Sequence, residues 1–234
     1  MGTESDKSSN EYILSDVSFS YGKRKILDNI GFSMESGKCY ALLGANGCGK
    51  STLMTILAGS RKAASGTLSF PDGTVCNLKS SGRSSLIGYV PQENPLINTL
   101  NGYDNLLLWY KGSGSELKKT IKSDLIQMLG IDSYLKRTVS KLSGGMKRRL
   151  SIAIGLINSP KILLLDEPSA ALDLPCKQDI AKYLDEYNKK GGTILLTTHE
   201  EAELSLCDRY MILKGGNITE HDPGMPVDKL ISLF

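Results

Sequence analysis

The stretch Gly44-Ala45-Asn46-Gly47-Cys48-Gly49-Lys50-Ser51-Thr52 is the most informative part of this chain. It follows an apolar, strand-like segment at 40–43 and precedes a helix-like segment at 53–58, which is the context that a phosphate-binding loop requires. Glycines let successive backbone N–H groups turn toward phosphate oxygens, and the helix adds free N–H groups and its positive dipole end. Lys50 would reach the β- and γ-phosphates and Ser51 would bind Mg²⁺. The sequence therefore predicts a nucleoside triphosphate site.

The composition is typical of a globular domain outside the membrane. The 234 residues are 40% hydrophobic and 23% charged, which suits one substantial domain. A net charge of +3 is too small to indicate nucleic-acid binding, and no apolar run approaches the ~20 residues that span a bilayer. The five cysteines form no Cys-x-x-Cys pair, and the polar segment 1–10 does not resemble a secretory signal. We therefore expect a cytoplasmic protein with no nucleic-acid partner.

The pattern along the chain changes twice. Strand-like runs dominate the first part, at 12–21, 25–34, 39–43, 66–70 and 86–90. Helix-like stripes follow at 101–111, 116–129 and 145–157. Strands and helices then alternate, with strands at 162–165, 193–197 and 210–213 and helices at 177–189 and 200–207. This order predicts an α/β nucleotide-binding core with a helical segment inserted after residue 90.

Two carboxylates follow the buried strand at 162–165. Ligands of open α/β sheets bind at the carboxyl ends of strands, so Asp166 and Glu167 are expected beside the phosphate-binding loop. Asp166 suits a Mg²⁺-linked role and Glu167 suits a base that orients water for attack on the γ-phosphate. Upstream, the turn at Ser143-Gly144-Gly145 begins a helix and offers a second anion-binding element.

With these motifs in order, residues 11–220 resemble the nucleotide-binding subunit of an ATP-binding-cassette (ABC) transporter. Seven motifs of the family are matched, in the family's order. They are the aromatic residue that stacks on adenine (Tyr21), the Walker A loop (Gly44 to Thr52), the Q-loop (Gln92), the signature (Leu142 to Met146), Walker B (Ile162 to Glu167), the D-loop (Asp173) and the switch histidine (His199). The resemblance implies a P-loop NTPase (RecA-like) core with an N-terminal antiparallel β subdomain and an inserted helical subdomain. The implied ranges are a disordered tail at 1–10, the core at 11–90 and 160–220, the helical subdomain at 91–159 and a C-terminal tail at 221–234, whose helix would pack on the core.

The resemblance also implies roles for individual residues. Catalysis would use Lys50, Gln92, Glu167 and His199, and Mg²⁺ would be held through Ser51, Gln92 and Asp166. ATP would contact Tyr21, Gly44, Ala45, Asn46, Gly47, Cys48, Gly49, Lys50, Ser51, Thr52, Gln92 and Asp166. In a head-to-tail homodimer, or a pair with another cassette, formed on ATP binding, the partner subunit would add Ser143, Gly144, Gly145, Met146 and Asp173 to the same ATP. ATP and Mg²⁺ are therefore the expected cofactors.

A transporter subunit of this kind docks on a separate membrane-spanning permease, at the cytoplasmic face of the membrane. The resemblance places the docking cleft between the Gln92 loop and the helical segment, near 93–109. We expect Trp109 and Tyr110 in the helical core rather than in that contact. The basic run Lys147-Arg148-Arg149 is expected to be a solvated helix face.

The sequence context favours export over import. The run at 144–150 resembles the signature of the drug, lipid, bacteriocin and polysaccharide efflux branch, whereas importers more often carry glutamines after the glycines. Two alternatives stay open: a soluble non-transport ABC ATPase such as an iron–sulfur assembly factor, and a regulatory module that closes on ATP but turns over slowly. Cys48 occupies a loop position where the family more often has a small or hydroxyl residue, and its thiol could be reactive or inert.

Overall fold

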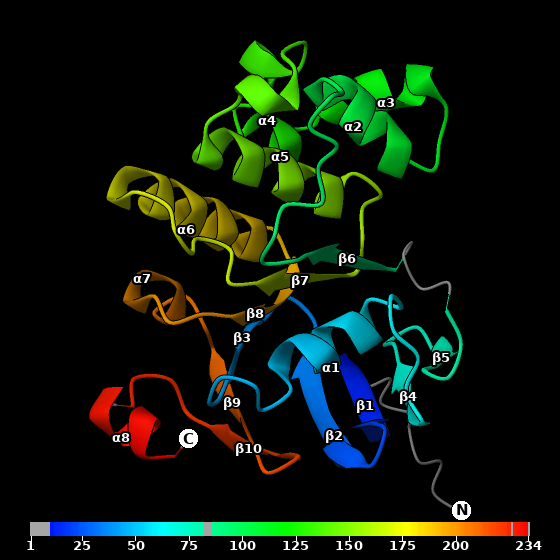
Figure 1. Cartoon of the computed structure of the whole chain (residues 1–234), viewed down its shortest axis with the longest axis vertical. Coiled ribbons are helices and arrows are strands. Elements are labelled where there is room, and N and C mark those ends of the chain that lie inside the picture. The colour runs from blue at the N-terminus through cyan, green and yellow to red at the C-terminus, as the bar shows by residue number, and fades with distance from the viewer. Residues whose placement is uncertain (1–9, 82–85, 226, 234) are drawn as a thin grey trace, which may run out of the picture.

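Two β-sheets and a set of helices make up residues 10–81, 86–225 and 227–233, which the computed structural model describes (Figure 1). The smaller sheet is antiparallel and has the order β2-β1-β4-β5. Its strands are β1 (Glu11–Tyr21), β2 (Arg24–Glu35), β4 (Ser65–Ser69) and β5 (Val75–Asn77). The predicted tail at 1–10 lies outside the described residues except for Asn10, whose carbonyl accepts a hydrogen bond from the Ser36 N–H.

The larger sheet has six strands in the order β10-β9-β3-β8-β7-β6, parallel except for the edge strand β10. They are β3 (Cys39–Leu43), β6 (Ile87–Val90), β7 (Ile162–Asp166), β8 (Thr193–Thr197), β9 (Arg209–Lys214) and β10 (Asn217–His221). The three central strands β3, β7 and β8 are buried along their whole length. This explains their continuously apolar sequences, because both faces of a parallel sheet are covered.

The helices lie on both sides of this sheet (Figure 1). They are α1 (Lys50–Leu57), α2 (Gly102–Trp109), α3 (Gly114–Ile121), α4 (Asp124–Gln127), α5 (Gly144–Leu156), α6 (Leu174–Lys189), α7 (Glu201–Leu204) and α8 (Val227–Ser232). Helices α2 to α5 fall between β6 and β7 in the chain and form the group at the top of Figure 1. Among the described residues, none of the helices combines the length and the apolarity that crossing a membrane needs.

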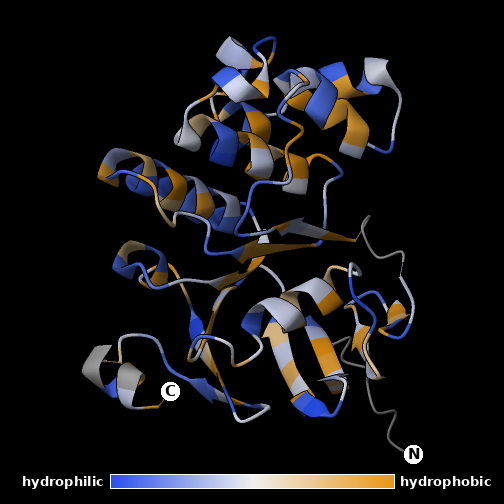
Figure 2. Ribbon diagram, viewed as in Figure 1, coloured by the Kyte–Doolittle hydropathy of each residue, from blue (hydrophilic) through white to orange (hydrophobic). Residues whose placement is uncertain are grey.

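Alternate residues of β3 belong to two different cores. Cys39, Ala41 and Leu43 pack with residues of α5 and α6, whereas Tyr40 and Leu42 pack with β1, β2 and α1. This alternation follows from the two-residue period of a strand. The strand therefore joins the helical side of the molecule to the antiparallel sheet, and hydrophobic residues concentrate along the central strands (Figure 2).

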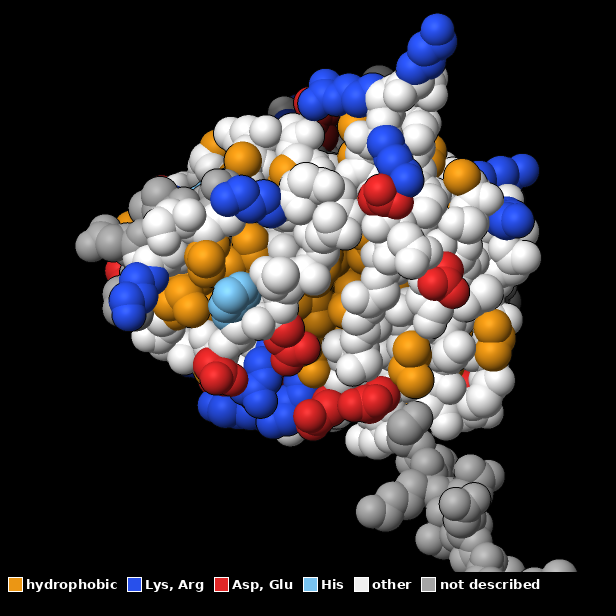
Figure 3. Space-filling view, turned by 90° about the horizontal axis from the view of Figure 1, so that it is seen from below, with side chains coloured by type: hydrophobic (Ala, Val, Ile, Leu, Met, Phe, Trp, Pro, Cys, Tyr) orange, Lys and Arg blue, Asp and Glu red, His pale blue; other side chains and the backbone are white. Residues whose placement is uncertain are grey.

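One predicted helix differs from the structure, and two strands of the structure are absent from the prediction. The stripe at 116–129 is interrupted after Ile121, because Ser123 adopts an extended backbone conformation. Strands β5 and β10 have no counterpart in the prediction. β5 has only three residues and β10 is polar except at Ile218, so neither shows the alternation that identifies a strand. On the face seen in Figure 3, basic and acidic side chains are mixed, in keeping with the net charge of +3.

A close approach of backbone to backbone fixes helix α5 against the edge strand β6. A Cβ atom on Gly88 would lie 2.1 Å from the carbonyl oxygen of Gly155. In turn, a Cβ atom on Gly155 would lie 2.8 Å from Val90 Cγ2. The two glycines therefore allow the helix that follows the signature turn to rest directly on the strand that leads to Gln92.

We predict that Gly88→Ala lowers the free energy of unfolding by about 1–3 kcal/mol, since an added methyl group forces helix and strand apart. The matched control is Gly114→Ala, where the nearest atoms to the new Cβ lie 3.8 Å away. This control should leave the free energy unchanged or raise it by up to about 1 kcal/mol. Urea unfolding of both variants measures the difference; equal stability of the two would contradict the close-approach argument.

Candidate nucleotide-binding site

A cleft of about 750 Å³ lies at the carboxyl ends of the parallel strands. The register of the sheet places these ends together, with Asp166 of β7 opposite Thr197 of β8. The cleft is lined by Tyr21, Arg24, Ile26, Asn46, Gly47, Gly49, Lys50, Ser51, Thr52, Gln92, Asp166, Glu167 and His199. Predicted site residues from five separate segments of the chain therefore meet in one cleft.

The phosphate-binding loop wraps around the ammonium group of Lys50. Lys50 is the first residue of α1, is buried, and donates hydrogen bonds to the carbonyls of Gly44 (2.7 Å) and Ala45 (3.2 Å). Gly44 has φ 145°, and a Cβ atom there would lie 2.4 Å from the carbonyl oxygen of Leu213. Only glycine fits this position without displacing β9. Gly44, Ala45 and Cys48 shape the loop but do not line the cleft.

Asp166 and Glu167 leave β7 in different directions. Asp166 is buried and accepts a hydrogen bond of 2.5 Å from the Thr197 hydroxyl. Glu167 has φ 47°, a left-handed conformation that is costly for a residue with a side chain. Its N–H donates to both the carbonyl and the hydroxyl oxygen of Thr197, each at 3.0 Å. The end of β8 therefore holds the backbone that carries the Glu167 carboxylate.

The carboxylate of Glu167 lies between two other predicted catalytic side chains. Gln92 donates from Nε2 to Glu167 Oε2 at 2.8 Å, and His199 Nε2 lies 3.7 Å from Oε1. The three side chains come from the segments that follow β6, β7 and β8. Each one is placed by the carboxyl end of a neighbouring parallel strand.

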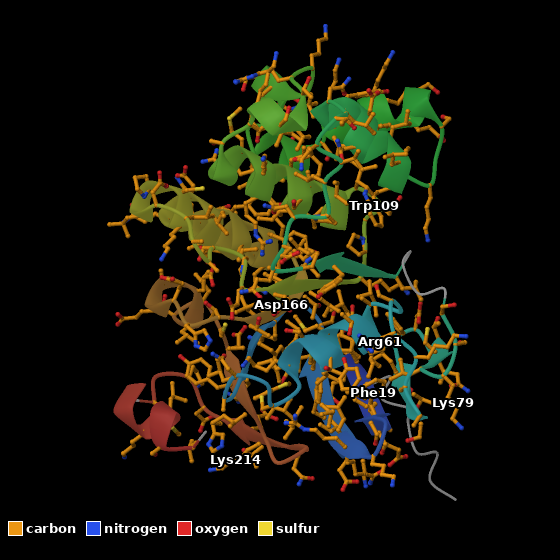
Figure 4. All side chains as sticks on the ribbon, viewed as in Figure 1. Phe19, Arg61, Lys79, Trp109, Asp166 and Lys214 are labelled. Atoms are coloured by element: carbon orange, nitrogen blue, oxygen red, sulfur yellow. The ribbon has the colours of Figure 1, made fainter. Side chains whose placement is uncertain are left out.

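The aromatic wall of the cleft has a cation behind it. Tyr21 is half-exposed, and its ring packs edge-to-face on Phe19 with the centroids 4.9 Å apart. The Arg61 guanidinium carbon lies 5.0 Å from the Tyr21 ring centroid and 5.3 Å from that of Phe19. Figure 4 labels Phe19 and Arg61 beside one another. Arg61 and Phe19 therefore fix the ring of Tyr21 at the rim of the cleft.

The predicted partner-facing residues line a separate pocket of about 500 Å³. Ser143 caps α5 by accepting a hydrogen bond from the Met146 N–H, and Asp173 caps α6 by accepting one from the Cys176 N–H. Helix α5 begins at Gly144, as the turn at 143–145 predicts. This pocket contains Ser143, Gly144, Gly145, Met146 and Asp173, and it shares no lining residue with the nucleotide cleft.

The prediction of a solvated basic face was wrong for Arg148. This side chain is only 3% exposed and donates to backbone carbonyls behind the cleft. Burial lowers the pKa of Arg148 to about 10, so the guanidinium stays charged at neutral pH. A run of three basic residues gives no sign of which one points inward, because that depends on the rotation of α5 against the sheet.

A buried carboxylate, Glu203, lies close to this guanidinium. Glu203 is 1% exposed and accepts a hydrogen bond from the Thr198 hydroxyl. Burial raises the pKa of Glu203, and the hydrogen bond from Thr198 and the nearby charge of Arg148 partly oppose that shift. Thr198 precedes His199, so the hydrogen bond to Glu203 holds the residue next to the predicted switch histidine.

Trp109 also differs from its predicted place. It is 50% exposed instead of packed in the helical core, and its neighbour Leu108 is 58% exposed. Tyr110 is partly buried and its hydroxyl lies 3.2 Å from the Thr120 hydroxyl. Both residues line a groove of about 490 Å³ together with Pro91 and Pro95. The end of α2 therefore presents apolar surface beside the Gln92 loop.

Comparison with known proteins agrees with this geometry. Residues 27–170, more than half of the chain, match the family model described as ABC transporter. The chain is 38% identical over 225 residues to the Nod factor export ATP-binding protein I of Rhizobium etli, covering 93% of this chain and 70% of that one. It is 35% identical over 203 residues to the linearmycin resistance ATP-binding protein LnrL of Bacillus subtilis, covering 85% of this chain and 64% of that one.

Solved structures support the fold. The dimeric, post-hydrolysis ATP-binding cassette MJ0796 bound to ADP and Pi has a TM-score of 0.77 at 26% identity and covers 92% of this chain and 100% of its own. A nucleotide-free ATP-binding cassette has a TM-score of 0.80 at 24% identity and covers 94% of each chain. The predicted fold class and family are thereby confirmed. The chain belongs to the ABC transporter family and is one of its ATP-binding, ATP-hydrolysing cassettes.

Proposed function

We propose that this cassette powers export through a separate membrane-spanning permease by hydrolysing ATP between two copies of the chain. The observation that carries the proposal is the cleft in which Lys50, Gln92, Glu167 and His199 meet. Two relatives, a Nod factor export ATP-binding protein and a linearmycin resistance ATP-binding protein, support the direction of transport. The proposed location is the cytoplasmic face of the membrane, as a peripheral subunit.

ATP would lie with its phosphates on the loop at 44–52 and its adenine on Tyr21. The free N–H groups at the start of α1 face the cleft where phosphate oxygens would bind. The Lys50 ammonium donates hydrogen bonds to two carbonyls of the loop and would also bind the β- and γ-phosphates. Every residue from Asn46 to Thr52 except Cys48 lines the cleft, which supports this placement.

The residues also fit a magnesium ion. Ser51, Gln92 and Asp166 offer a hydroxyl, an amide and a carboxylate oxygen to the same cleft. No cluster of three or more His, Cys, Asp or Glu suited to a metal occurs among the residues that the structure describes. This suits Mg²⁺, which is usually bound through one or two carboxylates, substrate phosphates and water. The ion would neutralise phosphate charge.

Hydrolysis would depend on Glu167. Its carboxylate would polarise the attacking water. Gln92 and His199 flank this carboxylate and would orient it, and His199 would also contact the γ-phosphate. Lys50 and the N–H groups of the loop would neutralise charge in the transition state. Most of the acceleration would therefore come from positioning and electrostatics.

A second copy of the chain would complete each site. The signature residues lie in a pocket distinct from the nucleotide cleft, so Ser143, Gly144 and Gly145 of the partner would close over the bound ATP. Met146 and Asp173 would complete the partner's contribution. Such a head-to-tail pair has two equivalent sites and two-fold symmetry, and the dimeric cassette with ADP and Pi supports this arrangement.

The groove beside the Gln92 loop is the proposed docking site for the permease. Leu107, Leu108 and Trp109 expose 40%, 58% and 50% of their surface at the end of α2. Figure 4 labels Trp109 at the lower end of the helical group, facing the rest of the molecule. Exposed apolar surface of this kind is typical of an interface with another protein.

We predict that Glu167→Gln slows ATP hydrolysis by about 10²-fold or more, the usual contribution of a general base, while ATP affinity stays unchanged. The ATP-bound dimer should accumulate because it no longer turns over. Steady-state phosphate release measures the rate, and sedimentation velocity with ATP measures the dimer. Glu200→Gln is the control, since Glu200 pairs with Lys177 and does not line the cleft. Unchanged turnover in Glu167→Gln would contradict the proposal.

The adenine contact gives a second prediction. Tyr21→Ala should weaken ATP binding by about tenfold, because stacking of a base on an aromatic ring contributes about 1–3 kcal/mol. Tyr21→Phe should keep the affinity, and Arg61→Met should weaken it by about 2–5-fold through loss of the cation–π contact. Equilibrium titration with a fluorescent ATP analogue measures all three. Equal affinities of Tyr21→Ala and Tyr21→Phe would place the base elsewhere.

The docking groove gives a third prediction. Leu108→Asp should abolish co-purification of a multi-span membrane protein with the tagged chain from detergent-solubilised native membranes, because a carboxylate in an apolar contact is costly. Val75→Asp is the control, since Val75 is 61% exposed on β5 and does not line the groove. Both variants should keep the melting temperature, as surface substitutions usually do. Recovery of the permease with Leu108→Asp would exclude this groove.

A further inference from the structure

Arg148 uses every N–H of its guanidinium on a different backbone carbonyl. The five acceptors are Pro168 (Nε, 2.5 Å), Pro91 (Nη1, 2.6 Å), Gln92 (Nη1, 3.3 Å), Asp166 (Nη2, 3.0 Å) and Glu167 (Nη2, 3.1 Å). An arginine has five donors and no acceptor. The side chain therefore satisfies its whole hydrogen-bonding capacity on the loop that follows β6 and on the end of β7 with the loop that follows it.

These two loops carry the amide and the carboxylate that meet in the cleft. Arg148 binds the carbonyls of Gln92 and Glu167 themselves, and the side chains of these two residues are hydrogen-bonded to each other at 2.8 Å in the cleft. The guanidinium is planar and rigid. It therefore fixes the distance between the two backbone segments. The hydrogen bond between the Gln92 and Glu167 side chains adds a second link between them.

Arg148 also acts on a strained residue. Glu167 has φ 47°, and its N–H is held by Thr197 from the side of β8. Its carbonyl is held by Arg148 from the side of α5. A left-handed conformation persists only where the surroundings impose it, and here the two contacts act on the two peptide groups that flank the Cα atom.

No other side chain of similar size can make this set of contacts. Lysine has three N–H donors on a flexible stem, and methionine has none. Removing donors leaves buried carbonyls without partners, which is unfavourable. The neighbouring Arg149 cannot substitute, because it is directed outward to Asp179 of α6.

We infer that Arg148 is a positioning residue for hydrolysis: it holds Glu167 in register with Gln92 and so places the carboxylate that acts on water. The inference rests on the proposed role of Glu167. It links the helix that follows the signature turn to the attack on the γ-phosphate. It also links the docking groove to that step, because Pro91, one of the five acceptors, lines the groove.

The test compares Arg148→Lys with Arg137→Lys. Arg137 is the matched control because it is exposed and donates to one carbonyl, that of Lys141. Arg148→Lys should lower kcat by about 10²-fold, the loss that a misplacement of about 1 Å can cause, with the Kd for ATP changed by less than about twofold. Arg137→Lys should change neither. A proportional loss of ATP binding and kcat, or an unchanged kcat, would overturn the inference.

A double mutant separates positioning from general destabilisation. If Arg148 acts through the Glu167 carboxylate, Arg148→Lys should slow single-turnover hydrolysis by less than about twofold in a Glu167→Gln background, because mutations in one unit are not additive. Leu117→Ala, a buried change in α3, is the stability control: it should lower the melting temperature and leave kcat at a permissive temperature. A further loss of about 10²-fold in the double mutant would mean that Arg148 acts independently of Glu167.

The outcomes distinguish the inference from the proposed function. Normal turnover in Glu167→Gln alone would refute the assigned role of Glu167, and the inference with it. Slow turnover in Glu167→Gln together with a normal kcat in Arg148→Lys would refute only the inference. If Arg148→Lys does not fold, Arg148→Gln supplies the same comparison, since its amide keeps two donors.

Discussion

The parallel pairing of β3, β8, β7 and β6 is the constraint on which the rest of the structure depends. It puts four strand ends side by side, with Asp166 opposite Thr197 and Leu165 opposite Val90. A phosphate-binding loop, an amide, two carboxylates and an imidazole therefore share one edge, although they lie far apart in the chain. The strands are buried on both faces, so a shift of register would expose apolar residues and displace every functional side chain at once.

The edge of the sheet is held by polar contacts that the apolar core cannot supply. Thr197 binds both Asp166 and the Glu167 N–H, and Arg148 binds the carbonyls on the other side. A buried cation is unfavourable unless its donors are satisfied, and here backbone carbonyls and the nearby Glu203 offset its cost. The conformation of Glu167 therefore depends on contacts from both β8, through Thr197, and α5, through Arg148.

The molecule keeps its functional surfaces apart. The nucleotide cleft, the signature pocket and the apolar groove at α2 have separate linings. In the proposed dimer the first two would form one site, and the proposed permease would cover the apolar side chains of the third. Helix α5 is linked to all three. Its first residues line the signature pocket, Ile154 and Gly155 line the groove, and Arg148 binds the backbone of the cleft residues Gln92 and Glu167.

The sequence by itself determined the family, the α/β class and most of the residues that line the nucleotide cleft, although not Arg24 and Ile26, which also line it. Phosphate binding needs a contiguous glycine-rich loop, and Asp166 and Glu167 directly follow an apolar strand, so local order carries this information. Only the tertiary structure decided that Arg148 is buried and that Trp109 is exposed. These two residues belong to amphipathic segments whose rotation against the sheet no local pattern reveals. For α5 this rotation is fixed where the helix contacts β6 at Gly88 and Gly155, a long-range packing that forms when the whole sheet is assembled.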